Sequence, residues 1–494
     1  MTMLIRSKWN LYSDLQISGS LFFSTRPVIR FSPHIDSLYL RISRSGDPNI
    51  SMARLLDHWV EEGRPVKRSE LHKIIKQLRK YRRFSHALQV SEWMSNEMNN
   101  QLPTADIAIQ LDLKSKVQGL DEAERYFSSI PETSKVSKVY CALLNCYAEH
   151  GYVEKAEAIM QKLQQCSSIS VLTYNVMLSL YRRLGKYEEL ETLMEEMKEK
   201  HICDRYTYCI RLNAYAKTLD IEGMEKFLLQ MEADVAAVDW HTYALAANAY
   251  IKAGLSEKAL QMLKRSEHLI NGSSRTKRIA YEALLNMYAS IGNKPEVYRV
   301  WSMCKNLERS RNSVYVSMIG SLLKLDDIDG AERILDEWES DNTCSDIRIP
   351  NLLISAYCKK GFLDKAEAFL SRYLNLGMKP EGITWALFAN GYKEQNDMEK
   401  TVEMVKKAIM ADRQVSRLNP STLSACIKHL KGKGDSEYAI ELINLCRQRG
   451  IISVGTYDRL FNYIQNENPD TSMEQHFLLD RKYQLPDGEK EDSY

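Results

Sequence analysis

Apolar side chains recur three and four residues apart in short runs along the chain, and a turn residue follows each run. In the stretch from residue 171 to 204, VLTYNVMLSLYRRLGKYEELETLMEEMKEKHICD, Tyr174, Leu178 and Tyr181 share one helical face. This spacing predicts an amphipathic helix. Gly185 then favours the left-handed turn that commonly ends a helix. A second apolar run follows the glycine, so the stretch predicts a helix hairpin.

The same hairpin pattern recurs along most of the chain. Aligning the sequence on itself gives units that start at residues 68, 104, 137, 171, 205, 240, 278, 312, 347, 382, 420 and 454, with a mean step of about 35 residues. The fourth residue of a unit is mostly aromatic: Tyr140, Tyr174, Tyr208, Tyr243, Tyr281, Tyr315 and Trp385. The eleventh is mostly tyrosine: Tyr147, Tyr181, Tyr215, Tyr250, Tyr288, Tyr357 and Tyr392. We interpret both sets as packing residues between helices, with base stacking as the alternative.

Two small residues complete the pattern. Glycine falls at the fifteenth position as Gly151, Gly185, Gly254, Gly292, Gly361 and Gly434, and alanine at the twentieth as Ala87, Ala123, Ala156, Ala259, Ala331, Ala366 and Ala439. The alanine lets the second helix approach the first closely. One hairpin cannot bury its apolar face alone, so neighbouring hairpins must stack. The sequence therefore predicts an all-α fold, a right-handed α-solenoid (superhelix) of about eleven helix-turn-helix repeats.

The ends of the chain depart from the repeat. Residues 1–44 are predicted to be a leader, 45–67 an N-terminal capping helix, 68–453 the repeat array, and 454–494 a partial repeat with an acidic C-terminal tail. The leader is rich in serine and arginine and contains only two acidic residues, Asp14 and Asp36. This composition is typical of a transit peptide. The stretch Phe22-Phe23-Ser24-Thr25-Arg26 resembles a mitochondrial processing site. A chloroplast leader or a merely disordered N-terminus are the alternatives.

Composition argues against enzymatic chemistry. The 10 cysteines form no CxxC pair, and the 10 histidines show no HExxH or clustered spacing, so we expect no metal site, no cofactor and no catalytic residues. The apolar runs are too short for a membrane span. The formal net charge of +2 neither requires nor excludes a nucleic acid partner, because a basic stripe can lie on a neutral protein.

The repeat resembles the pentatricopeptide repeat (PPR) of plant organellar proteins. Tetratricopeptide repeats favour glycine at the eighth position, whereas that position here holds residues such as Leu144, Leu178 and Ile319. The opening Thr173-Tyr174-Asn175 and the stretch Met378-Lys379-Pro380-Glu381 match the PPR pattern. Units of regular length, with no deaminase signature, resemble the P class. The resemblance covers about residues 68–464.

This resemblance implies a function and a set of base-reading residues. In the family each repeat can contact one base of single-stranded RNA, chiefly through its fifth and last residues. Carried over here, the base-reading pairs are Asn175 with Asp204, Asn351 with Glu381, and Cys209 with Asp239. The first pair matches a combination that favours uracil, the second is a pyrimidine-type match, and the third has no clear assignment. Most other units depart from the family pattern.

A basic ladder recurs at the thirteenth position of seven units. We define it by Lys80, Lys116, Arg183, Lys217, Lys252, Lys324 and Lys359. Equal positions in stacked repeats form a line, and a line of cations suits a phosphate backbone. The alternative is that these cations only complement the dipole at the end of each first helix.

Two functions remain open at this stage. The first is a non-catalytic PPR protein that binds single-stranded RNA in mitochondria and acts in RNA stabilisation, processing or translation. The second is a structural or protein-interaction solenoid within a mitochondrial ribonucleoprotein such as the mitoribosome.

Overall fold

The computed structural model describes residues 37–44, 50–97, 102–165, 169–233, 238–307, 312–341, 346–411, 418–449 and 451–465. These residues form twenty-five α-helices and one short 3-10 helix, Glu132–Ser134, and they contain no strand. The predicted all-α solenoid of helix hairpins is confirmed. Residues 1–36, which hold most of the predicted transit peptide, and the acidic tail after residue 465 lie outside the described residues.

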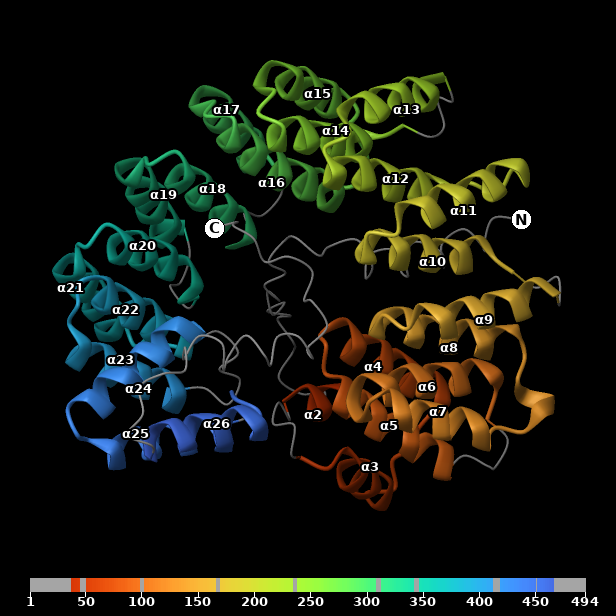
Figure 1. The fold of residues 1–494 in the computed structure, drawn as a ribbon, viewed down its shortest axis with the longest axis horizontal. Coiled ribbons are helices and arrows are strands. Elements are labelled where there is room, and N and C mark those ends of the chain that lie inside the picture. Colours follow the sequence, from red (N-terminus) through yellow and green to blue (C-terminus); the bar gives the residue numbers. More distant parts are fainter. Residues whose placement is uncertain are drawn as a thin grey trace. The chain divides into compact units, whose positions relative to one another are not determined.

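The chain divides into two compact units, residues 1–214 with 227–237, and residues 215–226 with 238–494. Within the described residues, eleven hairpins follow one another along the chain, each made of a first and a second helix (Figure 1). The first unit opens with α2 (Leu38–Arg44) and α3 (Met52–Glu61). Its complete hairpins are α4 (Arg68–Lys80) with α5 (Phe84–Glu97), α6 (Thr104–Gln118) with α7 (Leu120–Ser129), α8 (Ser137–His150) with α9 (Val153–Gln165), and α10 (Val171–Leu184) with α11 (Tyr187–Glu199).

The helices α12 (Arg205–Thr218) and α13 (Ile221–Ala233) each have residues in both units. The second unit continues with α14 (Trp240–Lys252), α15 (Ser256–His268), α16 (Ser274–Ser290), α17 (Lys294–Lys305), α18 (Asn312–Lys324), α19 (Ile328–Asp341), α20 (Arg348–Lys359), α21 (Leu363–Asn375), α22 (Gly382–Glu394), α23 (Met398–Ala411), α24 (Pro420–Gly432), α25 (Ser436–Gln448) and α26 (Val454–Gln465). Successive first helices from α14 to α24 pack directly on one another.

Ten of the eleven described hairpins turn at a left-handed residue in the fifteenth position, and the hairpin of α6 and α7 turns one residue later, at Gly119 with φ 94° and ψ 172°. Gly185 has φ 74° and lets the Lys186 amide donate to the Tyr181 carbonyl at 2.9 Å, which satisfies a carbonyl at the helix end. The other five glycines of the fifteenth-position set also have positive φ. Where glycine is missing, Arg82, Leu219, Asp326 and Asn396 take the same conformation. The repeat imposes this turn whether or not its residue suits it.

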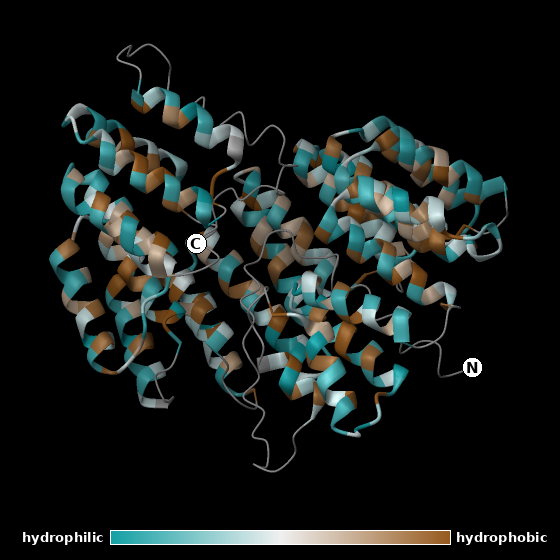
Figure 2. Ribbon diagram, turned by 90° about the horizontal axis from the view of Figure 1, so that it is seen from below, coloured by the Kyte–Doolittle hydropathy of each residue, from teal (hydrophilic) through white to brown (hydrophobic). Residues whose placement is uncertain are grey.

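The small and apolar positions form the core as predicted. All seven alanines of the twentieth position are 0 % exposed. Figure 2 shows hydrophobic and hydrophilic residues interspersed along the helices, as expected of amphipathic helices. None of the described helices is long and apolar enough to cross a membrane.

Hydrogen bonds between consecutive repeats extend the stacking. The Tyr357 hydroxyl donates to Glu332 of the preceding repeat at 2.6 Å, and Lys365 donates to the same carboxylate at 2.6 Å. Tyr250 and Lys258 meet Glu225 in the same way. The tyrosines of the eleventh position therefore pack between helices, and their hydroxyl groups form hydrogen bonds to the preceding repeat. We name each set of tyrosine, lysine and glutamate the inter-repeat triad.

The N-terminal cap begins earlier than the sequence suggests. Leu38 and Ile42, which fall in the predicted leader, lie on α2 and are buried in one cluster with Met52, Leu56 and Trp59 of α3. Arg41 also pairs with Glu62 at 2.5 Å. The serine and arginine content around α2 conceals the two apolar residues, four apart, that hold this helix in place.

Candidate nucleic-acid interface

The two helices of the repeat differ in charge. From α4 to α24, no first helix has more acidic than basic residues, and α4 and α12 have clear basic excesses. The acid excess lies in second helices, above all α11 with six glutamates and one lysine, and α19 with six acids and one arginine. A chain of nearly zero net charge thus presents first helices that suit a polyanion.

The last residue of a repeat begins the first helix of the next one. Asp204 accepts the Thr207 amide at 2.8 Å, and Asp239 accepts the Thr242 amide at 3.0 Å. The threonine hydroxyl returns the contact, because it accepts the backbone N–H of Asp239 at 3.3 Å. These are N-caps of the capping-box type. Two predicted base-reading residues therefore also hold helix starts.

Asn175 lies at the centre of one of these caps. Its side-chain Nδ2 donates to Asp204 Oδ1 at 3.2 Å, and its Oδ1 accepts the Thr207 hydroxyl at 2.9 Å. The residue is 1 % exposed. The structure brings Asn175 and Asp204 together as the sequence predicts, and it fixes the amide by a third residue, Thr207, that the sequence analysis did not single out. Threonine at the third position of a unit, after an aspartate, is the signal that could have found it.

Asn351 has different surroundings. It is 7 % exposed, and neither its Nδ2 nor its Oδ1 has a hydrogen-bond partner among the described residues. The Glu381 side chain is exposed, and its backbone N–H donates to the Thr384 hydroxyl at 3.3 Å. No hydrogen bond joins Asn351 to Glu381 or to Thr384 in the described part of this repeat.

The third predicted pair is less suited to read a base. Cys209 is 3 % exposed. Its carbonyl accepts the Asn213 side chain at 2.9 Å, which places the residue firmly within α12. A thiol is a weak hydrogen-bonding group, and a buried one behaves as a small apolar side chain.

The basic ladder separates into two groups. Lys116 donates to Asp112 at 2.7 Å and pairs with Glu149 at 3.1 Å, and these charges raise its pKa although burial opposes them. Arg183 donates to the carbonyl of Ala148, and burial lowers its pKa. The described partners of these two residues lie within the same repeat or the adjacent one and indicate a structural role within the stack, which neither interpretation of the ladder anticipated.

The remaining ladder residues, Lys80, Lys217, Lys252, Lys324 and Lys359, are exposed. Lys324 donates to the Ser290 hydroxyl at 2.8 Å, a neutral group that leaves its charge uncompensated, and burial lowers its pKa. The solvent-exposed part of the ladder thus lies mainly in the second unit, from Lys217 onward.

An acidic cluster on α6 is a feature that the sequence analysis missed. Asp106 is 3 % exposed and accepts Arg68 Nη2 and His72 Nε2, both at 2.7 Å. His72 is the fifth residue of its repeat. Aspartate on a predicted first helix, opposite an arginine-rich neighbouring helix, is the signal that could have indicated this network.

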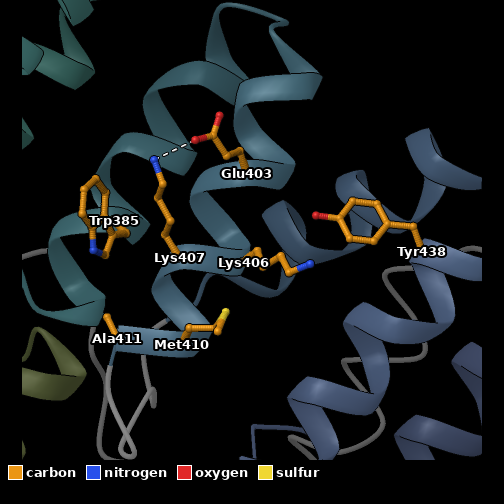
Figure 3. A pocket seen from close by; sticks show the side chains of 7 residues that line it. All are labelled: Trp385, Glu403, Lys406, Lys407, Met410, Ala411 and Tyr438. Atoms are coloured by element: carbon orange, nitrogen blue, oxygen red, sulfur yellow. Dashed lines mark ion pairs between the residues drawn. The ribbon is translucent and has the colours of Figure 1, made fainter.

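No group of three or more metal-ligating side chains occurs among the described residues. A shallow hollow of about 430 Å³ lies between α22, α23 and α25, lined by Trp385, Glu403, Lys406, Lys407, Met410, Ala411 and Tyr438 (Figure 3). Lys407 covers the Trp385 ring at 5.1 Å and pairs with Glu403 at 2.7 Å. The hollow contains none of the predicted base-reading or ladder residues.

Comparisons with known proteins agree with the repeat pattern. Models of the PPR repeat match residues 138–167, 241–267, 313–343 and 349–378, and a model of the PPR repeat family matches residues 169–217. A mitochondrial pentatricopeptide repeat-containing protein of Arabidopsis thaliana is 46% identical over 428 residues, which is 86% of each chain. The large ribosomal subunit protein mL101 of the same plant is 38% identical and covers 83% of this chain and 84% of its own.

Among solved structures, the maize pentatricopeptide repeat protein PPR10 matches with a TM-score of 0.42 and 19% identity, over 94% of this chain and 65% of that chain. With its repeats, its helix hairpins and relatives that match over most of its length, the chain belongs to the pentatricopeptide-repeat family.

Proposed function

We propose that this chain is a non-catalytic mitochondrial protein that binds single-stranded RNA and acts in RNA stabilisation, processing or translation. The observation that carries the proposal is the charge difference between the helix layers. Basic excess gathers on the first helices, which hold the fifth residues of the repeats, and Asp204 and Asp239, two of the last residues, cap the first helix that follows. Phosphates would lie against exposed ladder lysines, and unstacked bases against the fifth residues.

Binding by exposed cations makes the affinity depend on salt. For single strands the slope of log K against log salt changes by about 0.7 for each phosphate contact. Changing Lys252 and Lys324 together to alanine should therefore flatten the slope by up to about 1.4, with similar losses for all RNA sequences. Fluorescence anisotropy with a labelled single strand, at several salt concentrations, measures this slope.

Lys226→Ala is the matched control, because Lys226 is an exposed lysine on the second helix α13 and pairs with Glu222 at 2.7 Å. It should leave the slope unchanged. Equal affinity for duplex and single strand, or an equal effect of the control, would contradict the proposed interface.

The mitochondrial location is part of the proposal and is supported by the mitochondrial relatives. A reporter fused to residues 1–60 should enter mitochondria and lose a short N-terminal piece. Entry into chloroplasts instead would favour the alternative leader.

A second candidate function has its own support. The relative mL101 is, by name, a large ribosomal subunit protein, so this chain could act as a structural component of a ribonucleoprotein. Sedimentation of the tagged protein from mitochondrial extract separates the two candidates. Comigration with the large ribosomal subunit after RNase treatment of accessible RNA would favour the structural role.

A further inference from the structure

We infer that hairpin turns of the second unit form a docking edge for an anionic lipid bilayer, where exposed apolar side chains enter the membrane interface and lysines beside them meet lipid phosphates. Leu255 and Phe362 supply the apolar side chains. Lys252, Lys324 and Lys359 supply the neighbouring cations. This inference goes beyond the proposed RNA-binding function. We name the segments concerned the turn edge: residues 252–256, 290–294, 324–328 and 359–363.

Exposed apolar residues gather at the hairpin turns. Of the large hydrophobic residues that are exposed in the described repeats, nearly half lie at the fourteenth to sixteenth positions of a unit: Val117, Tyr152, Leu184, Leu219, Leu255 and Phe362. These are three of about 35 positions. A solvated turn ordinarily takes glycine, asparagine, aspartate or another polar residue. The excess of apolar side chains at the turns therefore indicates that they contact something other than water.

The sixteenth position is also the N-cap of the second helix. Asn293, Asp327 and Asp435 each accept a backbone N–H there with a side-chain oxygen. Leu255 and Phe362 are the N-cap residues of α15 and α21 and cannot make this bond. They are 39 % and 54 % exposed. Both residues forgo a stabilising cap without entering the core, which favours a functional role for the exposed side chain.

The turns of consecutive repeats lie next to one another. Lys324 donates to the Ser290 hydroxyl at 2.8 Å, and Lys360 pairs with Asp326 at 2.5 Å. The helices α14, α16, α18 and α20, which end at these turns, pack on one another in this order (Figure 1). Because packed helices lie about 8–10 Å apart, the turns three repeats apart at the two ends of the edge are separated by roughly 25–30 Å.

Lysines accompany the apolar residues along the turn edge. Its four segments contain five lysines and two aspartates. Both aspartates pair with lysines of the same edge, which leaves an excess of positive charge. Lys252 and Lys324 are exposed, and no carboxylate pairs with either of them among the described residues. A lysine can lay its methylene groups along an apolar surface while its ammonium group reaches a phosphate.

An anionic bilayer fits this pattern better than a folded partner does. A folded partner buries its anchors in a packed apolar patch or a pocket. Leu255 and Phe362 lie instead on separate turns with exposed lysines near them, and neither lines the hollow of Figure 3. The interface of a bilayer accepts isolated apolar side chains and offers anionic phosphates beside them.

The test is flotation of the full chain with vesicles of phosphatidylcholine alone, and with vesicles of phosphatidylcholine and phosphatidylglycerol in equal parts. Wild type should bind the anionic vesicles and not the neutral ones. Leu255→Ser with Phe362→Ser should weaken this binding by about tenfold, because two apolar contacts are lost. Serine is a good N-cap, so this variant should remain folded, which a thermal melting curve checks.

Leu374→Ser with Leu376→Ser is the matched control. These residues are 41 % and 56 % exposed, and they lie at the end of α21 opposite to Phe362. Their substitution should leave vesicle binding unchanged. Lys252→Ala and Lys324→Ala should each weaken binding by about fivefold.

Wild type that does not float with anionic vesicles, that binds neutral vesicles equally well, or that is affected equally by the control would overturn the inference. The RNA-binding proposal is judged separately, because Leu255→Ser with Phe362→Ser should leave the affinity for single-stranded RNA unchanged. Loss of RNA binding in this variant, with vesicle binding retained, would assign the turn edge to RNA instead.

Discussion

At the scale of single residues, the hairpin turn shows how far a periodic sequence determines local structure. The fifteenth position is left-handed in repeats that have glycine there, such as Gly361, and also in repeats that have Leu219 or Asp326. The glycine pattern therefore predicted the turn correctly. Repeats without glycine at this position are the ones in which the turn can carry conformational strain. Residues other than glycine, asparagine and aspartate are disfavoured in this left-handed region of backbone conformation.

Leu219→Gly should stabilise the protein. Leu219 has φ 55° and is 52 % exposed, so the substitution relieves left-handed strain and removes little buried surface. We expect a gain of about 1 kcal/mol in the free energy of unfolding, reduced somewhat by the greater flexibility of glycine in the unfolded chain. Chemical denaturation measures it. Gly361→Ala, at φ 79°, is the reciprocal control and should be destabilising; a loss from Leu219→Gly would disprove the strain.

The predicted base-reading positions show where prediction from sequence stops. The pairing of Asn175 with Asp204 could be predicted from the repeat register. The isolation of Asn351 could not, because it depends on whether one carboxylate reaches an amide, and Glu381 and Asp204 are equivalent in any pattern of charge and spacing.

At the scale of helices and hairpins, the inter-repeat triad connects one repeat to the next. The tyrosine of the eleventh position was predicted as a packing residue, but its acceptor was not identified. Glutamate recurs at the twenty-first position as Glu124, Glu157, Glu225, Glu332 and Glu367, and each accepts a tyrosine hydroxyl of the following repeat. This regularity is visible in the sequence, but its partner is one repeat away, which a search within single units does not reveal.

Tyr357→Phe should lower the free energy of unfolding by about 1–2 kcal/mol, because it removes a hydrogen bond to a charged acceptor and keeps the ring in place. The control is Tyr187→Phe on α11, whose hydroxyl has no hydrogen-bond partner in the described residues. Urea denaturation of both variants measures the difference. Equal stability of the two would show that the triad contributes nothing to stacking.

At the scale of the whole molecule, the tyrosines make stability depend on alkaline pH. Burial, followed by the hydrogen bond to glutamate, raises the pKa of Tyr181, Tyr250 and Tyr357, and burial raises the pKa of Tyr126 to about 12. An unfolded tyrosine ionises near pH 10. The folded state thus favours the neutral hydroxyls, so their contribution is complete below pH 10 and is lost as the pH rises above it.

An alkaline titration should show helicity and the ultraviolet absorbance of tyrosinate changing together above pH 10. Circular dichroism and absorbance on the same sample provide the measurement. Full ionisation of the tyrosines while the helices remain intact would show that the hydroxyls are accessible in the folded chain, contrary to their position between repeats.

The overall architecture was the most predictable property, because each repeat adds the same contacts and small errors at one unit do not accumulate. The limits of the array were less predictable. The only fully buried side chains of the described cap helix α2 are Leu38 and Ile42, and a serine-rich, arginine-rich context hides such a short apolar signal.

The N-caps at the repeat boundaries have a consequence for how such chains change over evolutionary time. Asp204 closes one duplicated unit, but its carboxylate starts the helix of the next unit. Duplication or recombination at this boundary joins a new last residue to the first helix of an existing repeat. A substitution of this last residue therefore also changes the N-cap, and with it the folding, of the following repeat. Under the proposed function, selection for new targets is therefore restricted to side chains that can both begin a helix and meet a base, namely aspartate, asparagine and serine.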